Sequence, residues 1–388
     1  MAMVPGEPIG RRGFLATSGA VGAGLGLAGC APAAPVSAPA APQAGKAEWE
    51  RQWEELVAAA RKEGALTVMS SPVATGYDKA VQDFSQAFRG IDADLRSFPG
   101  VADYAPKLTQ ERQAAIYSFD VALVPTAPEV QDLINGGMFD PVRPLMVRPD
   151  VLDEKAWIEG FDRGFQDLKR ATNYAHLYQV NRPFLINTDL VKEGEIKTVQ
   201  DLLDPKWKGK IFMADPRTGA AFLSMTVVRR NHGDDVVKRL IVDQEPIFSR
   251  DRRQLVELVM RGRYPIGLPS SPAPVIKEFR DAGLAGNLKQ PELPKVSFVV
   301  MYSVMVFNRA PHPNAAKLFI NWLLTKESQA AISKYVAINS RRSDVPPVDP
   351  ETVRTPGVEY VEMNREEIYP EIVKTQEFLA ELVKQRGG

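Results

Sequence analysis

Segments typical of strands and helices alternate along this chain in two separate sets, and this alternation constrains the fold more than any other feature. Each set contains short apolar runs typical of buried strands, followed by longer segments whose apolar residues recur at helical spacing. The first set covers about 49–124 and the second about 210–282. Strands that alternate with helices predict a parallel sheet with helices on both faces. We therefore expect an α/β protein with two lobes.

The individual elements can be placed from their apolar spacing and their stop signals. In the first set we expect helices at 49–63, 80–88 and 104–115, and strands at 66–69, 92–98 and 119–124. In the second set we expect strands at 210–214 and 264–268, and helices at 218–231, 252–261 and 274–282. Two apolar segments that end in Asn, 178–187 and 299–308, suit strands that cross between the lobes.

Length and charge limit the possible partners. The 388 residues, 44% hydrophobic and 25% charged, are ordinary for a soluble protein and suffice for two cores. Lys and Arg number 48 and so do Asp and Glu, so no overall field favours nucleic acid or an anionic membrane surface. We expect a monomer without a nucleic-acid partner, whose binding depends on a local site.

The first 29 residues have the pattern of an export signal. Arg11 and Arg12 lie in a polar stretch, and residues 14–29 are apolar, small or hydroxylic and too few for a transmembrane helix. The arginine pair resembles the twin-arginine signal, which a dedicated export pathway reads. A generic secretory signal that contains two arginines is the alternative.

A lone cysteine follows this leader directly. Residues 27–30, Leu-Ala-Gly-Cys, resemble the bacterial lipobox, in which the cysteine is lipidated and becomes the first mature residue. Cys30 is the only cysteine and cannot form an internal disulfide. Residues 31–45 are mostly Ala and Pro, a composition that stays extended. We expect the export signal at 1–29 and a lipidated tether at 30–47 that anchors the protein to the membrane.

Candidate ligand-binding residues follow the predicted strands. In open α/β sheets, ligands lie beyond the carboxyl ends of the strands. The loops selected by this rule contain Ser70, Ser71, Thr126, Ala127, Arg217, Thr218, Gly219, Ala220, Ser270 and Ser271. On the crossing segments, Tyr178 and Tyr302 are candidates for the hinge side of the cleft, with a place in the core as the alternative.

The loop at 215–221 carries the sharpest of these patterns. Thr218 can cap the following helix, and the small Gly219 and Ala220 let an anion approach its exposed N–H groups. Arg217 can add a bidentate clamp for a carboxylate or phosphonate. A plain capped helix with a solvated arginine is the alternative, just as Ser70 and Ser71 before Pro72 also suit a simple turn.

Several longer stretches carry a family resemblance. Residues 186–191, 201–211, 308–319 and 322–324 resemble the bacterial extracellular solute-binding proteins of the type II periplasmic fold, in the branch of iron(III) and general substrate-binding proteins of ABC transporters. The resemblance covers about 48–345. It implies two lobes joined by crossing strands, with a ligand cleft that closes by hinge motion and a membrane permease as partner.

The resemblance also implies a division of the chain. Residues 48–190 and 297–345 are expected to form lobe 1 with the hinge strands, and 191–296 to form lobe 2. Residues 346–388 are expected to be a helical segment, which the sequence assigns to neither lobe. The mature protein is expected outside the cytoplasm.

The ligand is constrained by what the chain lacks. Ferric-ion binders of this family typically use adjacent tyrosines, but the chain has no Tyr-Tyr pair, and the corresponding loop reads Pro269-Ser270-Ser271. We therefore expect no metal site and no cofactor, and favour a small organic or inorganic anion. Ferric-ion binding stays as the alternative.

An enzyme is the least favoured class. The chain has no nucleophile elbow, no HExxH, no P-loop and, beyond Cys30, no cysteine to pair with a histidine. We expect a binding protein that releases its ligand unchanged. A ligand sensor for a membrane receptor would use the same cleft, and the sequence does not separate sensing from transport.

Overall fold

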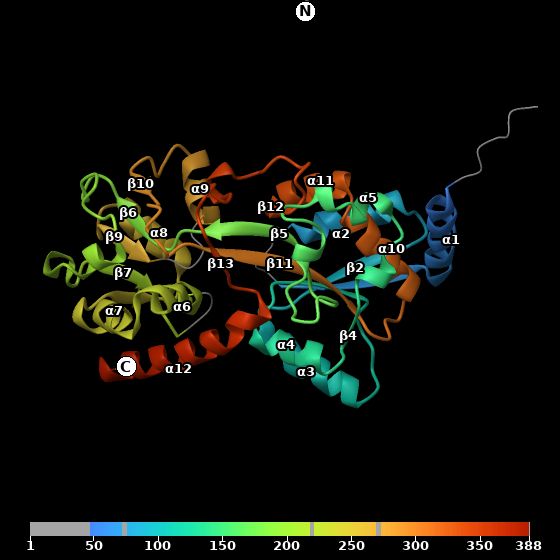
Figure 1. Ribbon diagram of the computed structural model, residues 1–388, viewed down its shortest axis with the longest axis horizontal. Coiled ribbons are helices and arrows are strands. Elements are labelled where there is room, and N and C mark those ends of the chain that lie inside the picture. Colours follow the sequence, from blue (N-terminus) through green and yellow to red (C-terminus); the bar gives the residue numbers. More distant parts are fainter. Residues whose placement is uncertain (1–46, 72–75, 218–220, 269–272, 388) are drawn as a thin grey trace, which may run out of the picture. The chain divides into compact units, whose positions relative to one another are not determined.

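Two mixed sheets organise the chain in the computed structural model, which describes residues 47–71, 76–217, 221–268 and 273–387 (Figure 1). Each sheet is covered by helices and has its own apolar core. The predicted α/β class with two lobes is confirmed.

The first sheet has eight strands, of which six follow the order β12-β5-β11-β3-β1-β2. Strand β1 (Ala65–Ser70) lies between β2 (Asp92–Ser97) and β3 (Val121–Val124) and is parallel to both, as predicted. The other strands are β4 (Phe139–Asp140), β5 (Tyr174–Asn181), β11 (Phe298–Phe307), β12 (Asn339–Ser340) and β13 (Val361–Glu362). The sheet as a whole is mixed, because the crossing strand β11 runs antiparallel to both β3 and β5.

Helices with one apolar stripe cover this sheet. In α2 (Tyr77–Ala87), Ala80, Val81 and Phe84 recur at helical spacing and are buried against the core. Gly64 ends α1 (Glu48–Glu63) in the left-handed conformation at φ 72°, which favours glycine. The remaining helices of this lobe are α3 (Val101–Gln113), α4 (Pro128–Asn135), α5 (Pro149–Leu152), α10 (Pro313–Leu323) and α11 (Lys326–Val336).

The second sheet has five strands in the order β10-β6-β9-β7-β8. These are β6 (Leu185–Asn187), β7 (Ile211–Ala214), β8 (Ile247–Ser249), β9 (Ile266–Leu268) and β10 (Leu288–Lys289). Helices α6 (Ala221–His232), α7 (Asp234–Lys238), α8 (Arg252–Met260) and α9 (Ala273–Asp281) lie in the same lobe. In this sheet β7 lies between β8 and β9 and runs parallel to both, so the carboxyl ends of these three strands share one edge.

Two long strands connect the lobes. Strand β11 matches the predicted crossing segment to within one residue at each end. The other predicted segment, 178–187, is not one strand: β5 ends at Asn181 and β6 begins at Leu185, with residues 182–184 between them. Pro183 has no N–H to donate to a sheet, which accounts for the break.

The C-terminal segment ends in helix α12 (Tyr369–Gln385), which packs against α6 (Figure 1). Leu379, Leu382 and Val383 share an apolar core with Met225 and Val228 of α6. The end of the chain is therefore attached to lobe 2, although β13 pairs with β11 in the first sheet.

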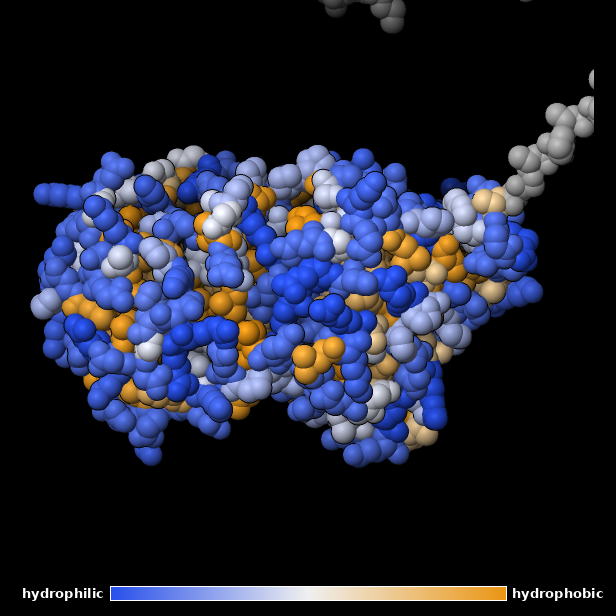
Figure 2. All heavy atoms as spheres, in the orientation of Figure 1, coloured by the Kyte–Doolittle hydropathy of each residue, from blue (hydrophilic) through white to orange (hydrophobic). Residues whose placement is uncertain are grey.

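The surface is largely polar. Figure 2 shows a mostly hydrophilic face on which apolar residues form small, separate groups. Among the described residues, no helix is both long and apolar enough to cross a membrane.

Candidate ligand-binding site

The lobe 1 side of the predicted site lies at the end of β1, where two serines differ in their bonding. Ser70 is buried, and its Oγ lies 2.7 Å from Oγ of Ser97 at the end of β2. Ser71 is also buried, but its Oγ has no hydrogen-bond partner among the described residues. A buried hydroxyl without a partner costs free energy, which a ligand atom can recover. Of the two serines, Ser71 is the better candidate for ligand contact.

Thr126 and Ala127, at the end of β3, form a second part of this side. The Thr126 hydroxyl donates to the carbonyl of Asn364 at 3.3 Å, and the Asn364 amide donates back to the Thr126 carbonyl at 2.8 Å. The hydroxyl is therefore used within the protein. Ala127 precedes α4 in an extended conformation and makes no side-chain cap, so it can offer only backbone groups.

The lobe 2 side carries an ion-pair cluster at the end of β7. Arg217 binds Asp215 in bidentate fashion, with Nε and Nη2 at 2.9 and 3.0 Å from the two carboxylate oxygens, and Nε of Arg250 lies 3.3 Å from the same carboxylate. Burial raises the pKa of Asp215, but its hydrogen bonds to Arg217 and Arg250 outweigh this and hold the pKa below its usual value. An ionised carboxylate thus faces two cations, and the cluster has a net positive charge.

The arginines of this cluster differ in exposure. The Arg250 side chain is 73% exposed and that of Arg217 37%, whereas Asp215 is 5% exposed. The solvent-facing part of the cluster is therefore its guanidinium groups. Arg217 lies in the loop after β7, and one edge of its guanidinium fork is occupied by Asp215.

The two candidate tyrosines lie on opposite faces of the crossing strands. Tyr302 pairs with Leu177, while its neighbour Met301 pairs with Tyr178. Successive side chains of a strand point to opposite faces, so Tyr302 and Tyr178 do not come together. Tyr302 packs in the main core of lobe 1, and Tyr178 packs in a separate small cluster.

Tyr302 faces the side where lobe 2 approaches. Burial raises its pKa to about 12, and the positive charge of Arg252, the first residue of α8, opposes the shift. The phenol is therefore protonated at neutral pH. Phe222 and Leu223 of α6 also pack against the core that contains Tyr302.

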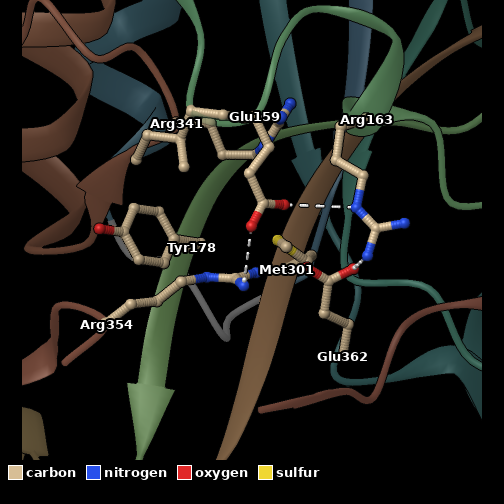
Figure 3. A pocket seen from close by; sticks show the side chains of 8 residues that line it. Glu159, Arg163, Tyr178, Met301, Arg341, Arg354 and Glu362 are labelled. Atoms are coloured by element: carbon tan, nitrogen blue, oxygen red, sulfur yellow. Dashed lines mark hydrogen bonds and ion pairs between the residues drawn. The ribbon is translucent and has the colours of Figure 1, made fainter. Parts of the chain in front are cut away.

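Tyr178 lines a different pocket, of about 10 Å³, which Figure 3 shows. Glu159 lies between Arg163 at 3.3 Å and Arg354 at 3.5 Å, and Arg163 also reaches Glu362 at 3.5 Å. Glu362 accepts further from Arg354 and Arg365. This pocket is filled by ion pairs of the protein itself and leaves little room for a solute.

Other predicted site residues lie outside the part of the chain that the structure describes. They are Thr218, Gly219, Ala220, Ser270, Ser271 and the predicted lipidation site Cys30. Arg250 and Asn364 are structural partners of the site that the sequence rule did not select. The spacing of Asp215 and Arg217 is a local signal for their pairing, but nothing local indicates Asn364, which is far away in the chain.

A metal site finds no support in the residues that are described. Among them, no group of three His, Cys, Asp or Glu side chains is placed to hold a metal ion. The lobe 2 cluster combines two arginines with one carboxylate, and a cation is repelled by such a charge balance.

Comparisons with solved structures agree with the fold. The iron-bound HitA of Pseudomonas aeruginosa matches with a TM-score of 0.61 and 17% identity, over 82% of this chain and 99% of that one. Apo FutA2 of Synechocystis matches with a TM-score of 0.60 and 17% identity, over 82% and 98%. Ferric iron-binding protein A of Mannheimia haemolytica, in an open conformation, matches with a TM-score of 0.59 and 15% identity, over 84% and 98%. At these identities the likeness establishes the two-lobe fold.

The sequence comparisons add the family. No curated protein sequence matches the chain. Residues 79–358, well over half of the chain, match the family described as bacterial extracellular solute-binding protein. With its two α/β lobes and crossing strands, the chain therefore belongs to the bacterial extracellular solute-binding proteins.

Proposed function

We propose that the protein captures a small anionic solute between its lobes. As a member of its family it is an exported, extracytoplasmic protein and the solute-binding component of an ABC importer. The observation that carries the anion proposal is the lobe 2 cluster, in which Arg217 and Arg250 share the single carboxylate of Asp215. Guanidinium groups in excess at the edge of a sheet suit a carboxylate, phosphate or phosphonate.

Capture requires contacts from both lobes. A ligand that touches the lobe 2 arginines and Ser71 of lobe 1 binds the closed form better than the open form, so it shifts the protein toward closure. The closed form is the one delivered to the permease. Thr126 and Ala127 complete the lobe 1 side through backbone groups.

The ferric alternative is less well supported. HitA is an iron-bound protein by its own description, but the likeness to this chain lies in the fold. Ferric ion prefers anionic oxygen ligands, whereas Tyr302 is protonated and the charged cluster of lobe 2 is positive. A ferric ion would therefore have to overcome both burial and charge repulsion.

Mass spectrometry of solute retained by the natively purified protein, followed by calorimetry with that solute, tests the proposal. An anionic solute is expected. The substitutions Arg217→Ala and Arg250→Ala should each weaken its binding by about 1.5 to 3 kcal/mol. Arg261, which directly follows α8 and pairs with Glu257 of that helix, provides the matched control, since Arg261→Ala should leave affinity unchanged. Tight Fe(III) binding with a tyrosinate charge-transfer band would overturn the proposal.

The finer details of export and anchoring form a separate proposal. Arg11 and Arg12 support twin-arginine export, and residues 27–30 support lipidation of Cys30. Replacing both arginines by lysine should block export, and Cys30→Ala should release the mature protein from the membrane. An unmodified Cys30 in the mass spectrum of the membrane fraction would refute the anchor.

Delivery, rather than sensing or catalysis, is the proposed use of the cleft. The family and its fold are those of binding proteins, and we propose that this chain too returns its solute unchanged and acts as a monomer. A deletion strain should lose uptake of the retained solute. Normal uptake with a lost transcriptional response would favour a sensor, and a chemically altered solute would favour an enzyme.

A further inference from the structure

A groove runs beside α9 and β10 and is much larger than the pocket of Figure 3. Its volume is about 410 Å³, compared with about 10 Å³ for that pocket. One wall consists of Arg280 of α9 with residues 288–290, and the other of residues between 350 and 356. Arg182, between β5 and β6, also lines the groove. Small-molecule sites have volumes of about 300 to 1,000 Å³, so this groove can hold a ligand.

The wall at 350–356 is fixed to lobe 1. The side chain of Asn339, in β12 of the first sheet, accepts from the N–H of Asp349 at 3.0 Å. Its amide donates to the carbonyl of Asp349 at 3.1 Å and to Oγ1 of Thr352 at 3.0 Å. The other wall belongs to lobe 2, and Arg280 pairs with Glu351 between the walls. The groove is therefore bounded by segments of both lobes.

Four side chains that line the groove are cationic and one is anionic. The cations are Arg182, Arg280, Lys289 and Arg354, and the carboxylate is that of Glu351. Lys289 is exposed, and its ammonium group makes no hydrogen bond or ion pair with any residue in the described ranges. A groove lined mainly by one sign of charge attracts ions of the other sign.

Carboxylates just outside the groove reduce this positive charge but do not cancel it. Glu292 pairs with Arg182, and two further carboxylates pair with Arg354. The latter two belong to the network of Figure 3, where Arg163 and Arg365 also hold them. With these neighbours included, six cations meet four carboxylates. An excess of positive charge remains.

Two of the arginines are held in position by the protein. Arg182, whose side chain is 15% exposed, donates to the carbonyl of Glu351 and lies 3.4 Å from Oγ1 of Thr355. Arg280 donates to the carbonyl of Leu288 at 3.3 Å. An anion that meets such fixed guanidinium groups has little side-chain ordering to offset. The remaining lining is largely apolar and consists of Leu288, Pro350, Val353 and Pro356.

From these observations we propose that the groove is a second ligand site, which binds an organic phosphate or carboxylate with an apolar body. The anionic group pairs with Lys289 and competes with Glu351 for Arg280, while the apolar body lies against Leu288 and Val353. In the second sheet β10 is three strand spacings from β7, roughly 14 Å, so the site is separate from the arginine cluster of the cleft. The inference does not depend on the solute that the cleft captures.

Three probes test the ligand class by calorimetry. Phenyl phosphate carries both an anionic group and an apolar body, inorganic phosphate carries only the first, and benzyl alcohol only the second. Phenyl phosphate should bind at least about tenfold more tightly than phosphate, and benzyl alcohol should not bind. Equal affinity for the two phosphates, or no binding of phenyl phosphate, would overturn the assignment.

Exposed variants show where phenyl phosphate binds. Lys289→Glu should weaken its binding about tenfold, because the charge that meets the anion is reversed. Lys238→Glu is the matched control, since Lys238 is an exposed lysine of α7 outside the groove and should leave affinity unchanged. Equal affinities in wild type and Lys289→Glu would refute the site.

Arg250→Ala separates this site from the cleft. Binding in the groove should be the same in Arg250→Ala as in wild type, whereas the solute retained in the cleft should bind more weakly. If phenyl phosphate responded to Arg250→Ala and not to Lys289→Glu, it would bind in the cleft, the groove assignment would fail and the proposed function would stand. If phenyl phosphate responded only to Lys289→Glu and the retained solute ignored Arg250→Ala, the groove would stand and the proposed anion site of the cleft would fail.

Discussion

The two faces of the crossing strands β5 and β11 treat buried polar groups in opposite ways. On the face of Tyr178 and Met301, charged side chains are paired with one another, and Glu362 is held by two arginines (Figure 3). On the face of Tyr302, the side chain of Gln179 makes no hydrogen bond within the described part of the chain, and its amide atoms are not fully buried. The comparison teaches that one pair of strands can bury a network of paired charges on one face and leave an amide open to solvent on the other.

The largest loss of stability is expected on the face of Tyr178 and Met301, where charged side chains are paired with one another. Burial raises the pKa of Glu362, but Arg365 and Arg354 outweigh this, so its pKa is lowered and the side chain is ionised. Glu362→Gln leaves two partly buried arginines without their carboxylate. We expect a loss of about 3 kcal/mol in the free energy of unfolding, measured by urea denaturation.

Glu351 provides the control for this prediction. Its side chain is 64% exposed and pairs with Arg280. Glu351→Gln should cost less than about 0.5 kcal/mol, because exposed ion pairs contribute little. Equal losses in the two variants would show that the network of Figure 3 is no more important for stability than a surface pair.

A somewhat smaller loss of stability is expected at Asn364, which connects the turn at Thr126 to the crossing strand β11. The buried side chain of Asn364 accepts from the N–H of Met301 at 2.6 Å and donates to the carbonyl of Thr126 at 2.8 Å. Asn364→Ala leaves both backbone groups unpaired and should cost about 2 kcal/mol. Ligand affinity should fall as well, because Thr126 and Ala127 lose their support.

The exposed Asn231 is the matched control for this variant. Its amide donates to the carbonyl of Lys295, and Asn231→Ala should change neither unfolding nor affinity. Unfolding and calorimetry on both variants test this difference. If Asn364→Ala were destabilised but bound the ligand with unchanged affinity, the turn at Thr126 would not be part of the binding site.

His176 of β5 allows a test by pH. It is fully buried between Tyr77 and Gln329, and burial lowers its pKa to about 3. The unfolded chain takes up this proton near pH 6.5 and the folded protein only near pH 3. The neutral His176 therefore makes its full contribution to the free energy of unfolding above pH 6.5. This contribution is lost as the pH falls, by about 1.4 kcal/mol per pH unit below about pH 6.

The pH dependence of unfolding, measured between pH 4 and 7, checks this expectation. The difference between wild type and His176→Asn should grow smaller as the pH falls, since the variant has no imidazole to protonate. A wild-type slope in His176→Asn would contradict the assignment.

The sequence predicted the elements of this fold better than the orientation of the side chains within them. Apolar runs placed β1, β3, β7, β9 and β11 correctly, because these strands are buried and their composition reflects it. Strand β8 was missed, since its residues are only half-buried or exposed and give no apolar run.

The candidate site shows what local patterns cannot supply. The sequence selected Tyr178 and Tyr302 together, but the register of β5 against β11 places them on opposite faces. Register depends on pairing between segments more than a hundred residues apart, and a bulge beside Tyr302 shifts it further. The groove beside β10 was missed for the same reason, because its walls are segments far apart in the chain.

The smallest effect, and the sharpest test of the two faces, is expected at Tyr178. Its ring packs with Met301 on the side of the ion-pair pocket, away from Tyr302. Tyr178→Phe should therefore leave anion affinity unchanged and alter the free energy of unfolding by less than about 0.5 kcal/mol. Calorimetry on this variant beside Tyr302→Phe compares the two faces of the crossing strands. If Tyr178→Phe lost affinity and Tyr302→Phe did not, the ligand would lie on the opposite face of the strands, and the assignment of the cleft would have to be reversed.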